Sequence, residues 1–391
     1  MGGTNHTLQL PKGWRAQAWA RVQGARFETW TPQRRLLVSS SDGQITELTP
    51  GRGAPKAKTL INGLSDPQGM AFDTLGHTRV LYVAENNQLD RYVWHANGTV
   101  GSRSVVVGGL LGSAGSGNHP AKSIVVGKNH TIYMTGGSTS NASAGDLSAH
   151  PPRGVIYAVN PSTRRLSVYA TGVRNGEGLG FAPDGSLWTA VNQRDDIAYP
   201  FHHAYAGQPD AYGKVIQAYV NDHPPDELTR LRRGANLGWP YCDPDPDVHP
   251  GVQGSPLHYA QLGFDNDVQT NPGGKAFNCA KLEKIQRGLP AHSAPLGLSF
   301  LEGSKVPAQW RNGALVSTHG SWDRQPAAAP SVLWLPWNSR TRTLGAPVRL
   351  ISGFQLANGD RWGRSVDAIP GPDGNLYVTD DGSGTVYRIG P

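Results

Sequence analysis

One pattern recurs six times along this chain: an apolar strand, a tight turn and a second strand of the type LYV or LWT, usually followed by a third strand. The clearest copy, residues 174–196, turns at Pro183-Asp184-Gly185, where proline presets φ and glycine tolerates the positive φ that follows. One such unit leaves half of its apolar face exposed, and units packed radially bury it. The pattern therefore predicts an all-β fold, a six-bladed β-propeller with long loops on one face. The six units span residues 26–48, 69–92, 122–159, 174–196, 297–337 and 366–389.

The composition agrees with many short strands and turns. Among 391 residues, 50 glycines and 30 prolines are spread without a period, which argues against collagen. Apolar residues at helical spacing are rare, and residues 226–233 are the best helical candidate. We expect residues 1–391 to form a single propeller domain with a loop insertion at about 198–295. A loop of that length is usually functional, so we expect it to form a cap beside the central channel.

Charge and cysteine content restrict the class of partner. The net charge of +7 comes from scattered arginines, without the runs of like charge typical of nucleic-acid arms. We therefore expect no nucleic-acid partner, and no apolar stretch approaches the roughly 18 residues of a membrane span. Cys242 and Cys279 both lie in the insertion; one disulfide is the favoured interpretation and two free thiols are the alternative. A disulfide suits an exported protein, so we expect a periplasmic or extracellular location.

The sequence signatures of several common enzyme classes are missing. The chain has no Walker sequence, no His-Glu-x-x-His and no nucleophile elbow. Polar residues instead lie directly before or after the predicted blade strands. Because every blade of a propeller is threaded in the same direction, these strand ends meet at one mouth of the channel, where we predict a site. The residues are His119, Arg174, Asn175, Gln193, Arg194, Asp195, Asp196, His292, His319, Trp322, Arg324, Trp362 and Arg364.

Six segments carry a resemblance to a known family: GNHPAKSIVV, TGVRNGEGLGFAPDGSLWTAVNQRDD, GANLGWPYC, HSAPLGLSF, HGSWDR and WGRSVDAIPGPDGNLYVTDDGSGTVYRI. In this order they resemble the soluble sugar dehydrogenases that depend on pyrroloquinoline quinone (PQQ), closest to the sorbosone dehydrogenase-like or pyranose dehydrogenase branch. The resemblance covers most of the chain from about Leu64 onward. It implies an enzyme, a quinoprotein that oxidises a sugar hydroxyl of the aldose or pyranose type by hydride transfer to PQQ. It also implies an external electron acceptor such as a quinone, a cytochrome or a dye.

The resemblance assigns roles to individual residues. His119 matches the base that takes the hydroxyl proton, a role that suits an imidazole neutral near pH 7. Arg174 matches the arginine beside the reactive quinone carbonyl, where it would stabilise developing negative charge. Arginines bind carboxylates bidentately and tryptophans offer flat faces to a planar ring, as a tricarboxylate quinone requires. The implied cofactor-binding residues are Arg174, Asn175, His292, Trp322, Arg324, Trp362 and Arg364.

The resemblance also implies Ca²⁺, held partly by the backbone carbonyls of Gln193 and Arg194, since hard cations take oxygen ligands. The chain departs from the family pattern at two positions. Trp362 stands where the better-known glucose-oxidising members have an arginine, and their cofactor-binding lysine has no obvious counterpart because the region reads THGSW. Arg26 is the candidate replacement cation. Gln68 falls where relatives carry a polar group near the substrate.

Two other functions fit a propeller. A calcium-dependent lactonase would need side-chain carboxylate and asparagine ligands at the channel centre, and Glu177 is the one candidate ligand for that reading. A non-catalytic propeller would use the same scaffold to bind a glycan or a protein, since a fold by itself does not imply a function.

Overall fold

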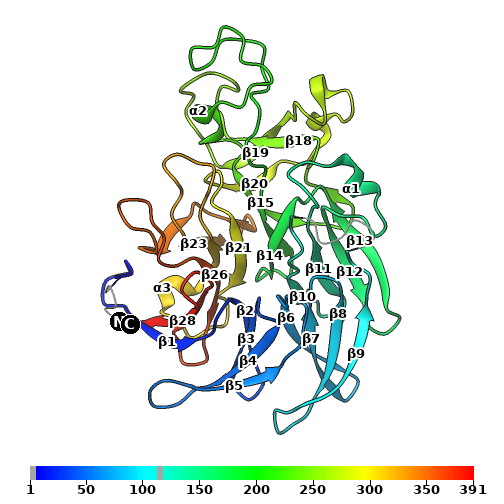
Figure 1. The fold of residues 1–391 in the computed structure, drawn as a ribbon, viewed down its shortest axis with the longest axis vertical. Helices are drawn as coiled ribbons and strands as arrows, with labels where there is room; N and C mark the ends of the chain where they lie inside the picture. The colour runs from blue at the N-terminus through cyan, green and yellow to red at the C-terminus, as the bar shows by residue number, and fades with distance from the viewer. Residues whose placement is uncertain (1–5, 112–117) are drawn as a thin grey trace.

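The computed structural model describes residues 6–111 and 118–391, and the strands of these residues form six sheets around one centre (Figure 1). Each innermost strand contacts the innermost strand of the next sheet, and the last contacts the first. This closed ring confirms the predicted six-bladed β-propeller. The innermost strands are β2 (Ala25–Trp30), β6 (Met70–Leu75), β10 (Ile124–Val126), β14 (Asn175–Phe181), β21 (Pro295–Phe300) and β26 (Ser365–Pro370).

In the first three blades, consecutive strands pair antiparallel, and in blade three the outermost strand also pairs in parallel with residues Ala235–Asn236. Their second strands are apolar and largely buried, because both faces of each sheet pack against a neighbouring blade. A short helix, α1 (Ala144–Ser148), lies in the loop between the second and third strands of blade three. The outer strands are β3 (Leu36–Ser40), β4 (Gln44–Thr49) and β5 (Lys56–Ile61) in blade one, β7 (Thr78–Ala84), β8 (Leu89–Trp94) and β9 (Val100–Val107) in blade two, and β11 (Ile132–Gly136), β12 (Val155–Asn160) and β13 (Arg165–Thr171) in blade three.

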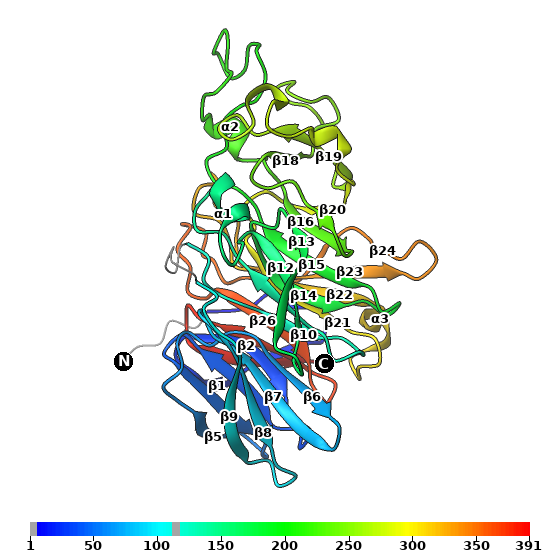
Figure 2. The same cartoon turned by 90° about the vertical axis from the view of Figure 1, so that its right-hand side faces the viewer.

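Blade four contains strands from inside the predicted insertion. Residues 226–233, expected to be helical, instead contain strand β16 (Asp226–Leu231), so the helix prediction was wrong. Hydrogen-bonding strands on both of its sides, β15 (Leu187–Asn192) and β20 (Ile285–Leu289), select the extended state. The rest of the insertion, residues 197–225 and 232–284, projects from one side of the ring and is called the cap (Figures 1 and 2). The cap contains α2 (Gln217–Val220), β17 (Ala235–Asn236), β18 (Cys242–Asp245), β19 (Ala260–Asn266), η2 (Pro272–Gly274) and η3 (Cys279–Lys281).

The last blade joins the two ends of the chain. Strand β1 (Arg15–Arg21) pairs with the C-terminal strand β28 (Thr385–Gly390), so the ring is closed by hydrogen bonds between segments far apart in sequence. A sheet closed this way leaves few exposed edges. The other elements of blades five and six are β22 (Gly313–Thr318), β23 (Ser331–Asn338), β24 (Thr343–Leu344), β25 (Val348–Ile351), β27 (Leu376–Asp380) and the short helix α3 (Ala308–Arg311).

The core is divided among the interfaces between blades. In the described residues, six apolar clusters each join two neighbouring blades; Trp188 and Trp337, for example, connect blades four and five. A seventh cluster, which includes Tyr199 and Tyr219, gives the cap its own apolar core. A disulfide joins Cys242 and Cys279 across 37 residues of the cap, as the sequence predicted. No helix in the described part of the chain is long and apolar enough to cross a membrane.

Candidate active site

Strand register gathers the predicted residues at one end of each blade. In blade four, Asn175 at the start of the first strand lies opposite Asn192 at the end of the second. In blade six, Ser365 and Asp380 are opposed in the same way. Residues just before a first strand and just after a second strand therefore share one end of the sheet. The six ends surround the channel mouth, where the sequence placed the site.

His119 precedes β10 and is held in one tautomer by Ser138. Its Nδ1 lies 2.8 Å from Ser138 Oγ, and the Ser138 hydroxyl donates its own proton to the carbonyl of Ser140 at 2.8 Å. Nδ1 must therefore be the donor, which leaves a lone pair on Nε2. Desolvation by its surroundings and the nearby positive charge of Arg174 lower the pKa of His119 to about 3. The ring is thus a neutral base at every pH near neutrality.

Arg174 is buried, and its guanidinium forms hydrogen bonds and an ion pair with blade four and with the loop after β11. Its Nη1 donates to the carbonyls of Gln193 at 2.6 Å and Asn192 at 3.2 Å. Its Nη2 donates to Asn141 Oδ1 at 2.9 Å and forms an ion pair with Asp195 at 2.7 Å. Arg174 therefore fixes the loop after β15 and adds a positive charge beside His119.

A second arginine, Arg26, lies at the centre of a set of polar contacts between blades. Its guanidinium is 3.2 Å from Glu177 and 2.9 Å from Asp381, and Nε donates to Gln68 Oε1 at 2.9 Å. Asn175 Nδ2 donates to the other oxygen of Glu177 at 3.1 Å, whereas its own Oδ1 is buried without a partner in the described residues. The sequence singled out four of these five residues, all except Asp381. They lie together although they come from four different blades.

His319 and Arg364 complete this network. His319 Nε2 is 2.8 Å from Asp381 Oδ1, and Arg364 Nε donates to the His319 carbonyl at 3.0 Å. Burial lowers the pKa of His319 and of Arg364. The contacts thus run from Asn175 through Glu177 and Arg26 to Asp381, and from there through His319 to Arg364.

Sequence reasoning missed Lys122. The lysine is 1% exposed, and its ammonium donates to the carbonyl of Pro120 at 2.8 Å. Desolvation, followed by the charge of Arg153, lowers the pKa of Lys122 to about 7, while Asp66 and Glu177 raise it. The sequence offered no lysine in the region after β22 and named Arg26 as the replacement cation, whereas Lys122 is a second buried cation, located before β10. The sequence contains no signal for this burial, because a single lysine in front of an apolar strand is not by itself a mark of it.

The loop after β15, with the predicted calcium ligands, is tightly held. The carbonyl of Gln193 already accepts from Arg174, and the Gln193 side chain donates to Glu227 at 2.7 Å. Arg194 points its guanidinium away, into an ion pair with Asp267 and a 2.9 Å hydrogen bond to Gln269. A carbonyl has two lone pairs, so the Gln193 oxygen retains one for a cation.

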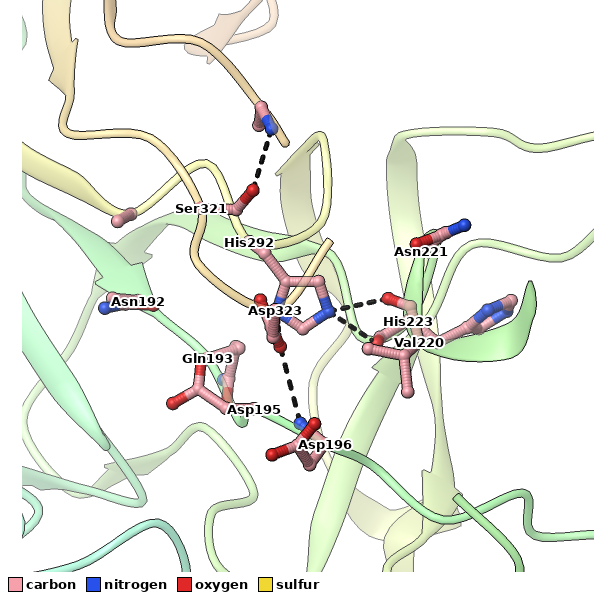
Figure 3. Close-up of polar contacts among 12 residues, drawn as sticks. Asn192, Gln193, Asp195, Asp196, Val220, Asn221, His223, His292, Ser321 and Asp323 are labelled. Carbon is pink, nitrogen blue, oxygen red and sulfur yellow. Dashed lines mark hydrogen bonds and ion pairs between the residues drawn. The ribbon is translucent and has the colours of Figure 1, made fainter. Parts of the chain in front are cut away.

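Next to this loop lies a set of oxygen and nitrogen donors (Figure 3). One atom each of Asp195, His292 and Asp323 falls within 4.8 Å of the others. His292 Nε2 donates to the carbonyls of Val220 at 2.7 Å and His223 at 2.9 Å, so Nδ1 faces Asp323 Oδ2 at 3.2 Å. The other oxygen of Asp323 is buried with no partner in the described parts of the chain. These donors suit a divalent cation.

Three predicted residues lie farther out. Trp322 is 69% exposed. Arg324 is 3.6 Å from Asp222 of the cap. Trp362 stacks on His6, with ring centroids 5.0 Å apart, and its Nε1 donates to the Gly353 carbonyl at 2.7 Å. The role of these three residues in binding a cofactor stays a prediction.

Comparison with known proteins identifies the family. A family model described as TrAA12-like matches residues 8–390, so the chain belongs to the TrAA12-like family. An uncharacterised protein from Borreliella burgdorferi is 28% identical over 402 residues, covering 98% of this chain and 90% of that protein. The family resemblance expected from the sequence is therefore confirmed.

Several solved structures share the fold. The holo form of the PQQ domain of Coprinopsis cinerea pyranose dehydrogenase has a TM-score of 0.78 and 20% identity, covering 100% of this chain and 98% of that one. The calcium structure of a Trichoderma reesei family AA12 enzyme has a TM-score of 0.79 at 18% identity, covering 100% and 98%. The PQQ-bound aldose sugar dehydrogenase of Streptomyces coelicolor has a TM-score of 0.58 at 14% identity, covering 98% and 99%.

Proposed function

We propose that this protein is a PQQ- and Ca²⁺-dependent dehydrogenase that oxidises a sugar hydroxyl or hemiacetal and passes the electrons to an external acceptor. Membership of the TrAA12-like family supports an oxidoreductase of this class. Solved relatives with this fold are described as PQQ-bound, as calcium structures and as sugar dehydrogenases. The exported location predicted from the cysteine pair remains part of the proposal, together with the sugar substrate.

The observation that carries the proposal is the state of His119. Its Nδ1–H donates to Ser138, so Nε2 carries the free lone pair of the ring. The pKa of about 3 keeps that lone pair free of a proton. A general base must be unprotonated and within reach of the hydroxyl proton that it removes. His119 is unprotonated without any ligand. In the proposed reaction, a bound sugar would place its hydroxyl within reach of Nε2.

The residues at the mouth fit a planar tricarboxylate. Arg26, Lys122 and Arg364 come from three different blades and supply nitrogen donors, and the buried Oδ1 of Asn175 has no partner in the described residues. Arginine and lysine bind carboxylates through charge-assisted hydrogen bonds. PQQ, when bound, would supply the acceptor for the hydride, which no side chain can provide. Lys122 would take over the role of the lysine that the THGSW region lacks.

The roles of the protein residues follow from their positions. His119 Nε2 would accept the proton of the sugar hydroxyl as the hydride leaves the same carbon. Arg174 adds a fixed positive charge near the reacting atoms and, being already oriented by its contacts with Gln193 and Asp195, needs no reorganisation. Ca²⁺ would be held at the loop after β15, by the Gln193 and Arg194 carbonyls together with the Asp195 and Asp323 carboxylates.

The lactonase alternative has no support in these contacts. Its candidate ligand, Glu177, is bound by Arg26 at 3.2 Å and by Asn175 at 3.1 Å. Both carboxylate oxygens of Glu177 are therefore already engaged by protein side chains. A binding-only propeller would not require His119 to be locked in one tautomer at so low a pKa.

Reconstitution tests the proposal. Metal-depleted protein would be mixed with PQQ and Ca²⁺. Binding would be measured from the absorption of the bound quinone, and activity from dye reduction with a panel of aldoses and pyranoses. We expect a bound quinone and sugar-dependent dye reduction, both requiring Ca²⁺. In His119→Ala we expect the quinone to remain bound and turnover to fall by about 10²–10⁴-fold, the usual contribution of a general base. Absence of quinone binding, or full activity in His119→Ala, would refute the proposal.

A further inference from the structure

The cap contains a second cluster of donors that the proposed reaction does not use. It consists of His223, just after α2, and of Asp245 and Asp247 on and after β18. One donor atom of each lies within 4.8 Å of the others, and all three residues are buried. Asp265 on the paired strand β19 adds a carboxylate whose Oδ2 is also buried and has no partner in the described residues.

The geometry does not match a simple ion pair. His223 Nδ1 lies 3.0 Å from the carbonyl of Tyr219, which can only accept, so Nδ1 carries the proton. Nε2 lies 3.4 Å from Asp247 Oδ2 and 3.6 Å from Asp245 Oδ1, and it forms no hydrogen bond within the described chain. A charge-assisted N–H···O bond would be about 2.7–2.9 Å long. Two ligands bound at about 2.0–2.1 Å to a tetrahedral ion lie about 3.3 Å apart, close to the spacing observed.

The charges of the cluster are unbalanced. Asp245, Asp247 and Asp265 bring three carboxylates into a buried region. Within the described ranges, the ion pairs of Asp245 and Asp247 involve His223 and neither a lysine nor an arginine. Burying uncompensated carboxylates is costly, and natural sites offset that cost with paired charges or a metal ion. A cation is therefore what the cluster lacks.

We propose that His223, Asp245, Asp247 and Asp265 bind a divalent transition-metal ion, of which Zn²⁺ is the best match. A donor set of one imidazole nitrogen and three carboxylate oxygens suits Zn²⁺, whereas Ca²⁺ prefers six to eight oxygens. The Nδ1 contact with the Tyr219 carbonyl fixes the tautomer and orients the ring, as outer contacts do for metal-binding histidines. The site is separate from the donors around Asp323 and does not depend on the proposed activity.

Such an ion would hold the cap together. It would tie the segment after α2 to the β18–β19 hairpin, whose first residue, Cys242, is also joined to η3 by the disulfide with Cys279. The backbone carbonyls of Val220 and His223 accept from His292 Nε2, so this segment also contacts the candidate active site (Figure 3). The metal would thus be structural, with an indirect effect on the position of His292.

Zinc binding in the presence of excess Ca²⁺ tests the proposal. Chelator-treated protein would be titrated with Zn²⁺ by calorimetry, and the Tm would be measured with and without the ion. Co²⁺ would serve as a spectroscopic probe of imidazole and carboxylate ligation. The variants would be His223→Gln and Asp247→Asn. Two controls match them: Asp210→Asn removes the carboxylate of an exposed histidine–aspartate pair of the cap, His202 and Asp210, and Asp323→Asn alters the other donor cluster.

We expect one equivalent of Zn²⁺ and a higher Tm in the wild-type protein and in both controls. In His223→Gln and Asp247→Asn, the affinity for Zn²⁺ should fall at least about tenfold. The rise in Tm on adding Zn²⁺ should also be lost. If one of these two variants does not fold, the other carries the comparison. The proposal is overturned if Zn²⁺ does not bind, if excess Ca²⁺ displaces it, if the two variants bind as the wild type does, or if Asp323→Asn alone abolishes binding.

Discussion

The Nδ1–H of His119 donates to the hydroxyl oxygen of Ser138, 2.8 Å away, because that hydroxyl already donates to the carbonyl of Ser140. The serine is therefore a positioning residue for the base. In Ser138→Ala the tautomer is no longer selected, and we expect kcat to fall about tenfold or more with quinone binding unchanged. Dye-reduction kinetics and a quinone titration would check this. Ser148→Ala, which alters an exposed serine, is the control; an unchanged kcat in Ser138→Ala would contradict the assignment.

The low pKa of His119 predicts an unusual pH profile. Burial and Arg174 lower this pKa from 6.5 to about 3, so the neutral, active form of the base persists as the pH falls through 6.5. We expect kcat/KM for the sugar to show no acid limb near pH 6.5. Arg174→Gln removes the charge that helps to lower the pKa, and its acid limb should move to higher pH, whereas Arg174→Lys should not move it as far. An acid limb near pH 6.5 in the wild-type protein would show that the pKa of His119 is not lowered.

Gly137 makes room for His119. A Cβ at this position would lie 2.5 Å from the carbonyl oxygen of His119 and 2.7 Å from its Cβ. Gly137→Ala should therefore displace the base, and a shift of about 1 Å can reduce turnover by about 10²-fold. Gly145→Ala is the matched control, since its nearest atom is Ser143 Oγ at 3.7 Å. Equal kcat values for the two variants would mean that the backbone at His119 tolerates the added methyl group.

Asp323 is expected to contribute to calcium binding. One of its carboxylate oxygens is buried without a partner in the described residues, and the other faces His292 at 3.2 Å. In Asp323→Asn we expect the Ca²⁺ concentration needed for half-maximal quinone binding to rise at least about tenfold, a loss of about 1.4 kcal/mol in binding free energy. Asp360→Asn, at an exposed position, should leave it unchanged. If both variants need the same Ca²⁺ concentration for half-maximal quinone binding, Asp323 does not bind the ion.

The disulfide should stabilise the cap. Cys242 and Cys279 close a loop of 37 residues. The chain-entropy account assigns such a loop about 3–4 kcal/mol. Replacing both cysteines with serine should lower the free energy of unfolding by about that amount, as measured by guanidinium denaturation with far-UV circular dichroism. A loss well below 1 kcal/mol would mean that packing around Tyr199 and Tyr219 already holds the cap.

The number of blades could be predicted from short stretches of sequence, because most strand pairs within a blade join segments that are close together in the chain. Its strands pair with their neighbours in sequence, and turns such as Pro183-Asp184-Gly185 depend on residue types a few positions apart. Residues 226–233 were misread because no local signal decided their state. The extended conformation of β16 comes from pairing with β15 and with β20, which lies more than 50 residues later.

The site was predictable in outline. Antiparallel register brings the start of one strand beside the end of the next, as for Asn175 and Asn192, and the role of these residues in a common site stays a prediction. Lys122 was missed, since a single lysine before an apolar strand carries no mark of burial. The sequence also could not predict the tautomer of His119, because the tautomer depends on the direction in which the Ser138 hydroxyl donates.

By itself, the sequence determined the all-β class, the six repeated units, the cysteine pair and the types of residue at the strand ends, since each of these is written in short stretches of chain. Only the tertiary structure decided which charges meet. Arg26 pairs with Asp381, 355 residues away, and with Glu177, 151 residues away. Such contacts follow from the closing of the ring between β1 and β28, and burial in that ring then sets the protonation of His119 and Lys122.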